Sequence, residues 1–460
     1  MAIHHHPEPR PESCHQAFPD VVVDTTHAPK VQFGLDPGVG TVGVLPAGAT
    51  GRAETPGHLG PGDPASGAGG EESVVCPGHV PRLGVAGPPV VDAVTRTWMT
   101  SIWQAEKPVP RPPKATVDAN HFLSAYYPDT SYGGKRLFDD MVEQARAADR
   151  LGYRGVTLPE HHLINVLLTP SPLQMAVKIS CETERLELVT SVAVLPLHDM
   201  RIFAGEVIQA DILTDGRLVL GVGRGAFAYE MGRLGSPLEE SKARFDESLD
   251  VLIALMTEEE VSWDGEYYRF EALTVMPRPM TLPMPRMMIA VMNPPGIAAS
   301  TRRGFDIQTT PLAGRPELFR AQIAAHKEAK AEMGEAGRHL RIMMSRVIYC
   351  TQSEAQTREM VQRAHDYYSR FDNVFTGPGI VHNGDVEPLT RTQTIRELEQ
   401  NLIICQAEEM LDRLGEYAVA GIDEVILSSN LGQPQGDHLE GMERFASDVL
   451  PHLQQVSAAA

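Results

Sequence analysis

Apolar runs and helical spacing alternate along most of the chain, and the clearest case lies near its middle. Residues 188–195 form a nearly unbroken, Val-rich apolar run, which is typical of a strand buried on both faces. Phe203, Val207 and Ala210 then recur at helical spacing, and a second apolar run covers residues 217–222. Strand, helix and strand in about forty residues predict one βαβ unit of a parallel sheet.

Turn residues mark the boundaries of this unit. Asp199 precedes the helix, where a carboxylate can cap free backbone N–H groups. Asp215-Gly216 follows the helix, and we expect a left-handed turn there to end it. The second strand stops at the flexible loop Gly223-Arg224-Gly225, which carries one cation. In a parallel barrel, such a loop lies where anions are bound.

The same alternation continues on both sides of the central unit. Further strands are expected at residues 117–126, 155–158, 287–292, 306–310, 341–349 and 423–428. With the two strands of the central unit they make eight, which predicts a (β/α)8 TIM barrel with insertions over residues 116–455. An open doubly wound sheet is the alternative. No glycine-rich dinucleotide fingerprint follows the first strand, which counts against that alternative.

Three segments depart from the alternation. Residues 263–270 are expected to form a hairpin or cover strand, the Pro-punctuated residues 276–286 an extended connector, and residues 293–296 a turn. Residues 1–115 differ most, because their first hundred hold 14 Pro and 15 Gly and no period long enough for a core. We expect a disordered extension there. The biological start could be Met99, a hypothesis that native peptides from before Met99 in mass spectrometry would exclude.

Charge and composition exclude several classes of partner. The chain has 40 Lys+Arg against 60 Asp+Glu, a net charge of −20, which argues against nucleic acid or an anionic membrane as the partner. No apolar run approaches the roughly eighteen residues of a membrane span. The start, MAIHHHPEPRPES, lacks the apolar core of a secretory signal. Five scattered cysteines without metal or redox spacing indicate free thiols in the cytoplasm.

Polar side chains gather where the predicted strands end. Glu160, His161 and His162 close the second strand, and Arg224 follows the fourth. Adjacent residues on an extended chain face opposite sides, so one histidine can face the pocket while the other packs at the rim. A pocket histidine can act as an acid or base near neutral pH, whereas a hydrogen-bonded rim histidine is structural. Arg224 is either a phosphate ligand or a salt-bridge partner. No metal site is expected, since no helical His-x-x-x-His is present.

Four stretches, taken in order and in spacing, resemble one known family. They are LGYRGVTLPEHH at 151–162, the run from VLPLHDM to GVGRG at 194–225, WDGEYYRF at 263–270 and GIDEVILSS at 421–429, followed by FASDVLPHL at 445–453. Together they resemble the bacterial luciferase-like flavin-dependent monooxygenases. The resemblance covers about residues 117–455.

The resemblance implies a barrel that binds FMN or, in one branch, a deazaflavin coenzyme. In such monooxygenases reduced FMN arrives from a separate flavin reductase and reacts with O2, and the flavin peroxide oxygenates an aldehyde- or ketone-like substrate. We therefore expect a flavin-dependent monooxygenase, as a homodimer, acting on a small apolar molecule. Phe122, Tyr126, Leu163 and Phe227 are the expected pocket residues. The alternatives are a deazaflavin-dependent oxidoreductase and a non-catalytic flavin-binding protein.

The resemblance also implies roles for single residues. His161 matches the first His of the family's Glu-His-His, which acts as an acid or base, and it lies between Glu160 and His162. Arg224, with Gly225 beside it, matches an arginine that contacts the FMN phosphate.

Three further positions concern the cofactor. Lys242 stands where a second phosphate-binding arginine is common, and Ser191-Val192 falls where many members have a cis peptide beneath the flavin ring. The chain departs from the family at residues 292–296, where two prolines remove backbone donors. Asn293 and the backbone N–H of Gly296 are expected to take over the phosphate contact, especially if Gly296 opens a helix.

Overall fold

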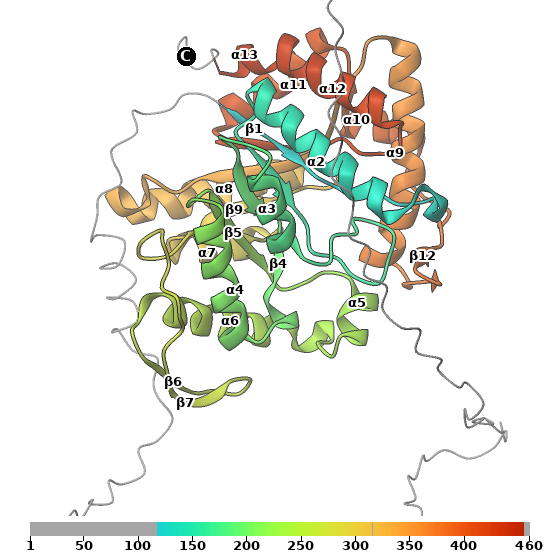
Figure 1. The fold of residues 1–460 in the computed structure, drawn as a ribbon. Coiled ribbons are helices and arrows are strands. Elements are labelled where there is room, and N and C mark those ends of the chain that lie inside the picture. The colour runs from blue at the N-terminus through green and yellow to red at the C-terminus, as the bar shows by residue number, and fades with distance from the viewer. Residues whose placement is uncertain (1–116, 315, 455–460) are drawn as a thin grey trace, which may run out of the picture. The chain divides into compact units, whose positions relative to one another are not determined.

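A closed barrel of parallel strands forms the centre of the computed structural model, which describes residues 117–314 and 316–454 (Figure 1). Its wall consists, in order, of β1 (Asp118–Phe122), β2 (Gly155–Leu158), β3 (Glu187–Thr190), β5 (Leu218–Gly223), β8 (Arg286–Ala290), β9 (Asp306–Thr309), β10 (Ile342–Cys350) and β14 (Glu424–Ser428). Because β1 pairs with both β2 and β14, the sheet closes on itself. This confirms the predicted barrel and excludes the open doubly wound sheet. The extension predicted to be disordered, residues 1–115, lies outside the described residues.

Helices connect the strands and surround the barrel, as the alternation of apolar runs and helical spacing predicts. The larger ones are α2 (Gly134–Leu151), α3 (Pro172–Ser180), α4 (Met200–Leu213), α6 (Leu238–Thr257), α7 (Pro294–Arg302), α8 (Pro316–Met333), α9 (Glu354–Phe375), α11 (Ala407–Ala420) and α12 (Gln435–Asp448). Both predicted ends of α4 are confirmed. The Asp199 side chain accepts a hydrogen bond from the backbone N of Arg201, and Asp215 and Gly216 both have positive φ.

Two predicted elements were wrong in detail. The apolar run 188–195 is not one strand, because β3 ends at Thr190, a cis peptide joins Ser191 to Val192, and β4 (Ala193–Val194) pairs separately with β5. The turn predicted at residues 293–296 is the first turn of α7. Proline suits the first turn of a helix, where backbone N–H groups have no partner within the helix.

Insertions enlarge the barrel at two places. The predicted hairpin is present as β6 (Val261–Asp264) and β7 (Arg269–Leu273), and it lies beside α6 (Figure 1). The carboxylate of Glu247 on α6 holds it by accepting hydrogen bonds from Trp263 Nε1 and from the backbone N of Tyr267 and Tyr268. Between β10 and β14 the chain adds smaller elements around α9 and α11, namely β11 (Val381–His382), β12 (Asp385–Val386), α10 (Ile395–Asn401) and β13 (Ile403–Cys405).

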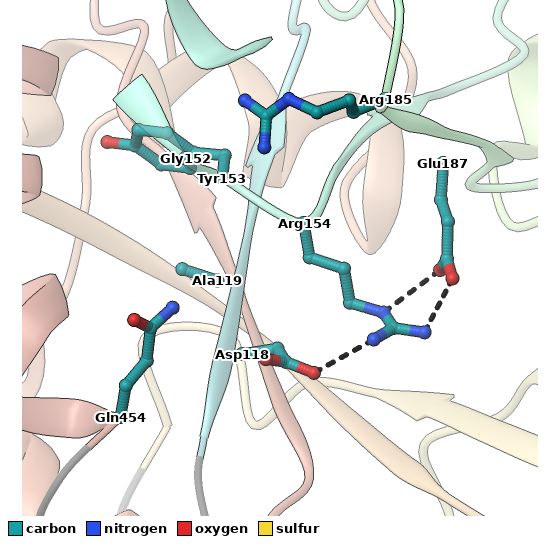
Figure 2. A pocket seen from close by; sticks show the side chains of 8 residues that line it. All are labelled: Asp118, Ala119, Gly152, Tyr153, Arg154, Arg185, Glu187 and Gln454. Atoms are coloured by element: carbon teal, nitrogen blue, oxygen red, sulfur yellow. Dashed lines mark hydrogen bonds and ion pairs between the residues drawn. The ribbon is translucent and has the colours of Figure 1, made fainter. Parts of the chain in front are cut away.

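The inner face of the barrel is charged at the N-terminal ends of the strands and apolar in the middle. At the N-terminal ends of the strands lies an ion-pair network, in which Arg154 donates to Asp118 and Glu187 (Figure 2). These residues line a pocket of about 290 Å³. The middle of the barrel is apolar and includes the buried Val189, Val219, Met288, Met343 and Ile426. This packed layer separates the charged end from the C-terminal end of the strands.

Candidate active site

The sequence-predicted catalytic residues meet at the C-terminal ends of the strands. Glu160, His161 and His162 follow β2, Ser191 follows β3, and Arg224 follows β5. Parallel strands place their C-terminal ends at one rim of a barrel, and in TIM barrels chemistry takes place there. The pocket in Figure 2 lies at the other end of the strands and is lined by charged groups that already pair with one another. We therefore place the candidate active site at the C-terminal rim.

Glu160 organises one side of this rim. Its side chain is only 1% exposed and accepts hydrogen bonds from His162 Nε2 at 2.9 Å, His198 Nε2 at 2.8 Å and the backbone N of Val194 at 2.7 Å. Burial alone raises the pKa of a carboxylate, but the hydrogen bonds from His162 and His198 outweigh it and lower the pKa of Glu160 to about 2. The hydrogen bond to Glu160 in turn raises the pKa of His162. Glu160 is thus an ionised anchor rather than a proton donor.

His161 faces a different carboxylate. Its Nδ1 lies 2.9 Å from Oε2 of Glu230, and its ring stacks on Phe227 with centroids 4.2 Å apart. In the neutral tautomer that suits this contact, Nδ1 carries the proton that it donates to the carboxylate, and Nε2 carries the lone pair. The two histidines therefore point to different partners, as strand alternation predicts, and Glu230 fixes the orientation of the His161 ring.

Glu230 is a residue of the candidate site that the sequence pattern missed. It lies on α5 (Ala228–Arg233), six residues after Arg224, and is 4% exposed. Its second oxygen, Oε1, accepts from the backbone N of His162, so one carboxylate fixes both the ring of His161 and the adjoining backbone. A glutamate just beyond the C-terminal end of a barrel strand was the available signal.

Arg224 is an exposed cation without a partner in the part of the chain that the structure describes. No hydrogen bond or ion pair joins its guanidinium to another described residue. Gly225 beside it has φ +82°, a backbone conformation that L side chains rarely adopt, so this position favours glycine. Within residues 117–314 and 316–454 Arg224 therefore forms no salt bridge, and its charge is available to an anionic ligand.

The other predicted phosphate contacts already have partners within the protein. Lys242 is exposed on α6 and pairs with Asp246 at 2.6 Å. Asn293 caps α7, with its Oδ1 2.7 Å from the backbone N of Gly296, so these two groups satisfy each other. A cation that the sequence pattern did not indicate is Arg244, whose Nε is buried without a hydrogen-bond partner among the described residues.

An aromatic cluster stands beside His161. Phe122, Tyr126 and Phe227 belong to one buried cluster, and Phe227 meets Phe371 of α9 edge to face at 5.7 Å. Leu163 differs from the other expected pocket residues, because it is 47% exposed. The apolar surroundings of His161 suit an apolar substrate.

No group of His, Cys, Asp and Glu side chains within residues 117–314 and 316–454 has an arrangement that could hold a metal ion. No helix in the same residues is both long and apolar enough to cross a membrane.

The Glu160 cluster makes stability depend on pH. Because folding lowers the pKa of Glu160 from 4.5 to about 2, its stabilising effect is present above pH 4.5 and is lost as the pH falls toward 2. The raised pKa of His162 acts oppositely, since its effect is present below 6.5 and is lost as the pH rises through the raised value. We expect Glu160→Gln to lose most stability relative to wild type between pH 4.5 and 6.5. Urea unfolding of both proteins across this range checks this, and a pH-independent difference contradicts it.

The geometry agrees with comparisons to known proteins. The family model described as luciferase-like monooxygenase matches residues 121–424, more than half of the chain. This protein belongs to the luciferase-like monooxygenase family. The membership indicates an enzyme rather than a non-catalytic flavin-binding protein, and the cis peptide at Ser191-Val192 is present where the resemblance implies one.

Relatives and solved structures in this family use more than one cofactor. The oxygenase component of a flavin-dependent trigonelline monooxygenase from Acinetobacter baylyi is 27% identical over 70% of this chain and 91% of its own. A coenzyme F420-dependent glucose-6-phosphate dehydrogenase from Beutenbergia cavernae is 26% identical over 68% and 93% of the two chains. The crystal structure of a monooxygenase from Streptomyces bottropensis has the same fold, with a TM-score of 0.64, 22% identity, and 73% and 99% of the chains covered. Family membership thus supports a flavin or a deazaflavin cofactor.

Proposed function

We propose that this protein is the oxygenase component of a two-component flavin monooxygenase. It uses reduced FMN from a separate flavin reductase, together with O2, to oxygenate a small apolar substrate of the aldehyde or ketone class. The observation that carries the proposal is the exposed Arg224, which has no partner among the described residues and lies on the same rim as His161, whose ring Glu230 orients. A relative named as an oxygenase component supports the need for a reductase.

The residues present fit FMN at two points. The exposed guanidinium of Arg224 suits the phosphate, since charge-assisted hydrogen bonds to arginine are the strong ones. The second point concerns the ring. Ser191 and Val192, which follow β3, lie on the C-terminal rim between His161 and Arg224, where the resemblance implies the flavin ring. Bound reduced FMN would supply the two electrons that activate O2, with one oxygen atom entering the substrate and the other leaving as water.

His161 would accept and return the proton that moves in this reaction. With Nδ1–H donated to Glu230, the lone pair of Nε2 can take a proton from a reacting group and return it later. Phe227 stacks on the ring and, with Phe371, keeps water from one side of it. Glu160 holds His162 and the backbone N of Val194 and so fixes the rim on which this base stands.

A deazaflavin-dependent oxidoreductase is the second candidate, because one relative uses that coenzyme at similar identity. Titrating the purified protein with reduced FMN, oxidised FMN and a deazaflavin separates the two candidates. The monooxygenase proposal further expects one atom of ¹⁸O from labelled O2 in the product when straight-chain aldehydes and cyclic ketones are tested with a reductase. Turnover with the deazaflavin in the absence of O2 would overturn it.

We expect Arg224→Ala to weaken the binding of reduced FMN by about tenfold or more. Losing one charge-assisted contact costs roughly 1.5–3 kcal/mol, and about 1.4 kcal/mol corresponds to tenfold in affinity. Anaerobic fluorescence titration measures the effect. Lys242→Ala is the matched control, and it should change affinity less because Asp246 already pairs with this lysine. Equal affinity of Arg224→Ala and wild type means that the phosphate binds elsewhere.

A further inference from the structure

Gln308 on β9 is a buried polar side chain to which the proposed function gives no role. It is 8% exposed, and its Nε2 donates to Ser191 Oγ at 2.5 Å. Gln308 shares the inner face of the barrel with Asp306, two residues earlier, which binds Arg286 inside the charged end. Gln308 therefore lies farther along the same inner face, toward the C-terminal rim.

The contact with Ser191 confirms this position. Ser191 follows β3, the third strand of the wall, whereas Gln308 belongs to β9, the sixth, and β5 and β8 stand between them. Side chains from strands that are not neighbours meet only across the interior. Gln308 and Ser191 thus form a polar floor beneath the rim that carries His161 and Arg224.

One atom of this floor lacks a partner. Oε1 of Gln308 is buried and accepts no hydrogen bond from any described residue. A buried, unpaired amide oxygen costs free energy, so such atoms usually meet a ligand or an ordered water. A second inner-face atom, Oγ1 of the fully buried Thr157, is also unpaired among the described residues.

We propose that Gln308, held by Ser191, binds the imide edge of the cofactor ring. The inference rests on the proposed function, because it assigns the partner of Gln308 within the same site. Flavins and deazaflavins share an imide N–H flanked by carbonyl groups, and a primary amide is complementary to that edge. Oε1 accepts from the imide N–H, and the second hydrogen of Nε2 is free for a ring carbonyl.

Methylation of the imide nitrogen removes the donor and tests the contact directly. We expect the wild-type chain to bind oxidised FMN about tenfold more tightly than FMN methylated at this nitrogen, the effect of one unpaired buried acceptor. Gln308→Ala removes the acceptor and leaves room for the methyl group, so it should bind FMN about tenfold more weakly and show no preference between the two. Gln308→Met keeps the volume and should also lose the affinity for FMN.

Thr309→Val is the matched control. Thr309 is the next residue on β9, faces the opposite side of the strand, and also has a buried hydroxyl without a partner among the described residues. This variant should keep the wild-type preference for unmethylated FMN. The proposal is overturned if wild type binds both flavins equally, a result that needs no variant, or if Gln308→Ala keeps the preference.

The outcomes separate this inference from the proposed function. If FMN binds and Arg224→Ala weakens this binding, but methylation of FMN does not change its affinity, only the role of Gln308 is wrong. If no flavin binds, the FMN proposal fails. The same titration with a deazaflavin and its imide-methylated form then decides whether Gln308 binds the deazaflavin ring instead.

Discussion

His161→Ala should lower the yield of oxygenated product per FMN oxidised by about 10²–10⁴-fold, the usual contribution of a general acid or base. The ring lies at the end of β2 and its Nδ1 contacts Glu230, which leaves Nε2 as the nitrogen for proton transfer. Without it, electrons from reduced FMN should leave as hydrogen peroxide rather than in product. Product and hydrogen peroxide are measured together for each FMN oxidised, and the variant should still bind reduced FMN.

His162→Ala is the control for this experiment. Its ring donates to the buried Glu160, which keeps hydrogen bonds from His198 and Val194 when His162 is removed. The expected effect is a loss of stability of about 1–3 kcal/mol. The coupling, meaning the yield of oxygenated product per FMN oxidised, should stay close to that of wild type. If His162→Ala loses coupling and His161→Ala does not, the roles of the two histidines are reversed. If neither changes coupling, the proposed chemistry is wrong.

Glu424→Ala should cost about 3–5 kcal/mol of folding free energy, the usual effect of removing one partner from a buried ion pair. Glu424 is fully buried at the N-terminal end of the barrel, where its carboxylate contacts Arg341 at 2.8 Å, Arg154 at 3.4 Å and Arg286 at 3.5 Å. Burial disfavours the charge on Arg286, but Asp306, Glu424 and Glu187 together raise its pKa. Removing Glu424 leaves these guanidinium groups short of negative charge.

The matched control for Glu424→Ala is Glu335→Ala. Glu335 pairs with Arg338, and the two side chains are 78% and 79% exposed. Exposed pairs contribute about 0–1 kcal/mol, so this variant should resemble wild type. Denaturant unfolding of the three proteins gives the comparison. A loss below about 1 kcal/mol for Glu424→Ala would show that the network at this end of the barrel adds little to stability.

Part of the candidate site could be predicted from the chain alone. His161 and Arg224 were found because both follow apolar strands, and a parallel barrel gathers such positions at one rim. The prediction that Lys242 and Asn293 contact a phosphate left out the protein groups near them in the sequence. Lys242 pairs with Asp246 one helical turn away, and Asn293 caps its own helix. Both competing contacts are local, so helix periodicity and capping preference were the signals that could have indicated them.

The sequence by itself determined the order of strands and helices and the ends of α4, because apolar period and capping act over a few residues. Only the tertiary structure decided which side chains meet. Glu230 reaches His161 across 69 residues, and Gln308 reaches Ser191 across 117. Such pairs leave no periodic signal, since closure of the barrel and the register of its strands bring them together. The break of the run 188–195 at Ser191-Val192 is of the same kind, because a Thr-Ser pair inside a Val-rich run does not by itself end a strand.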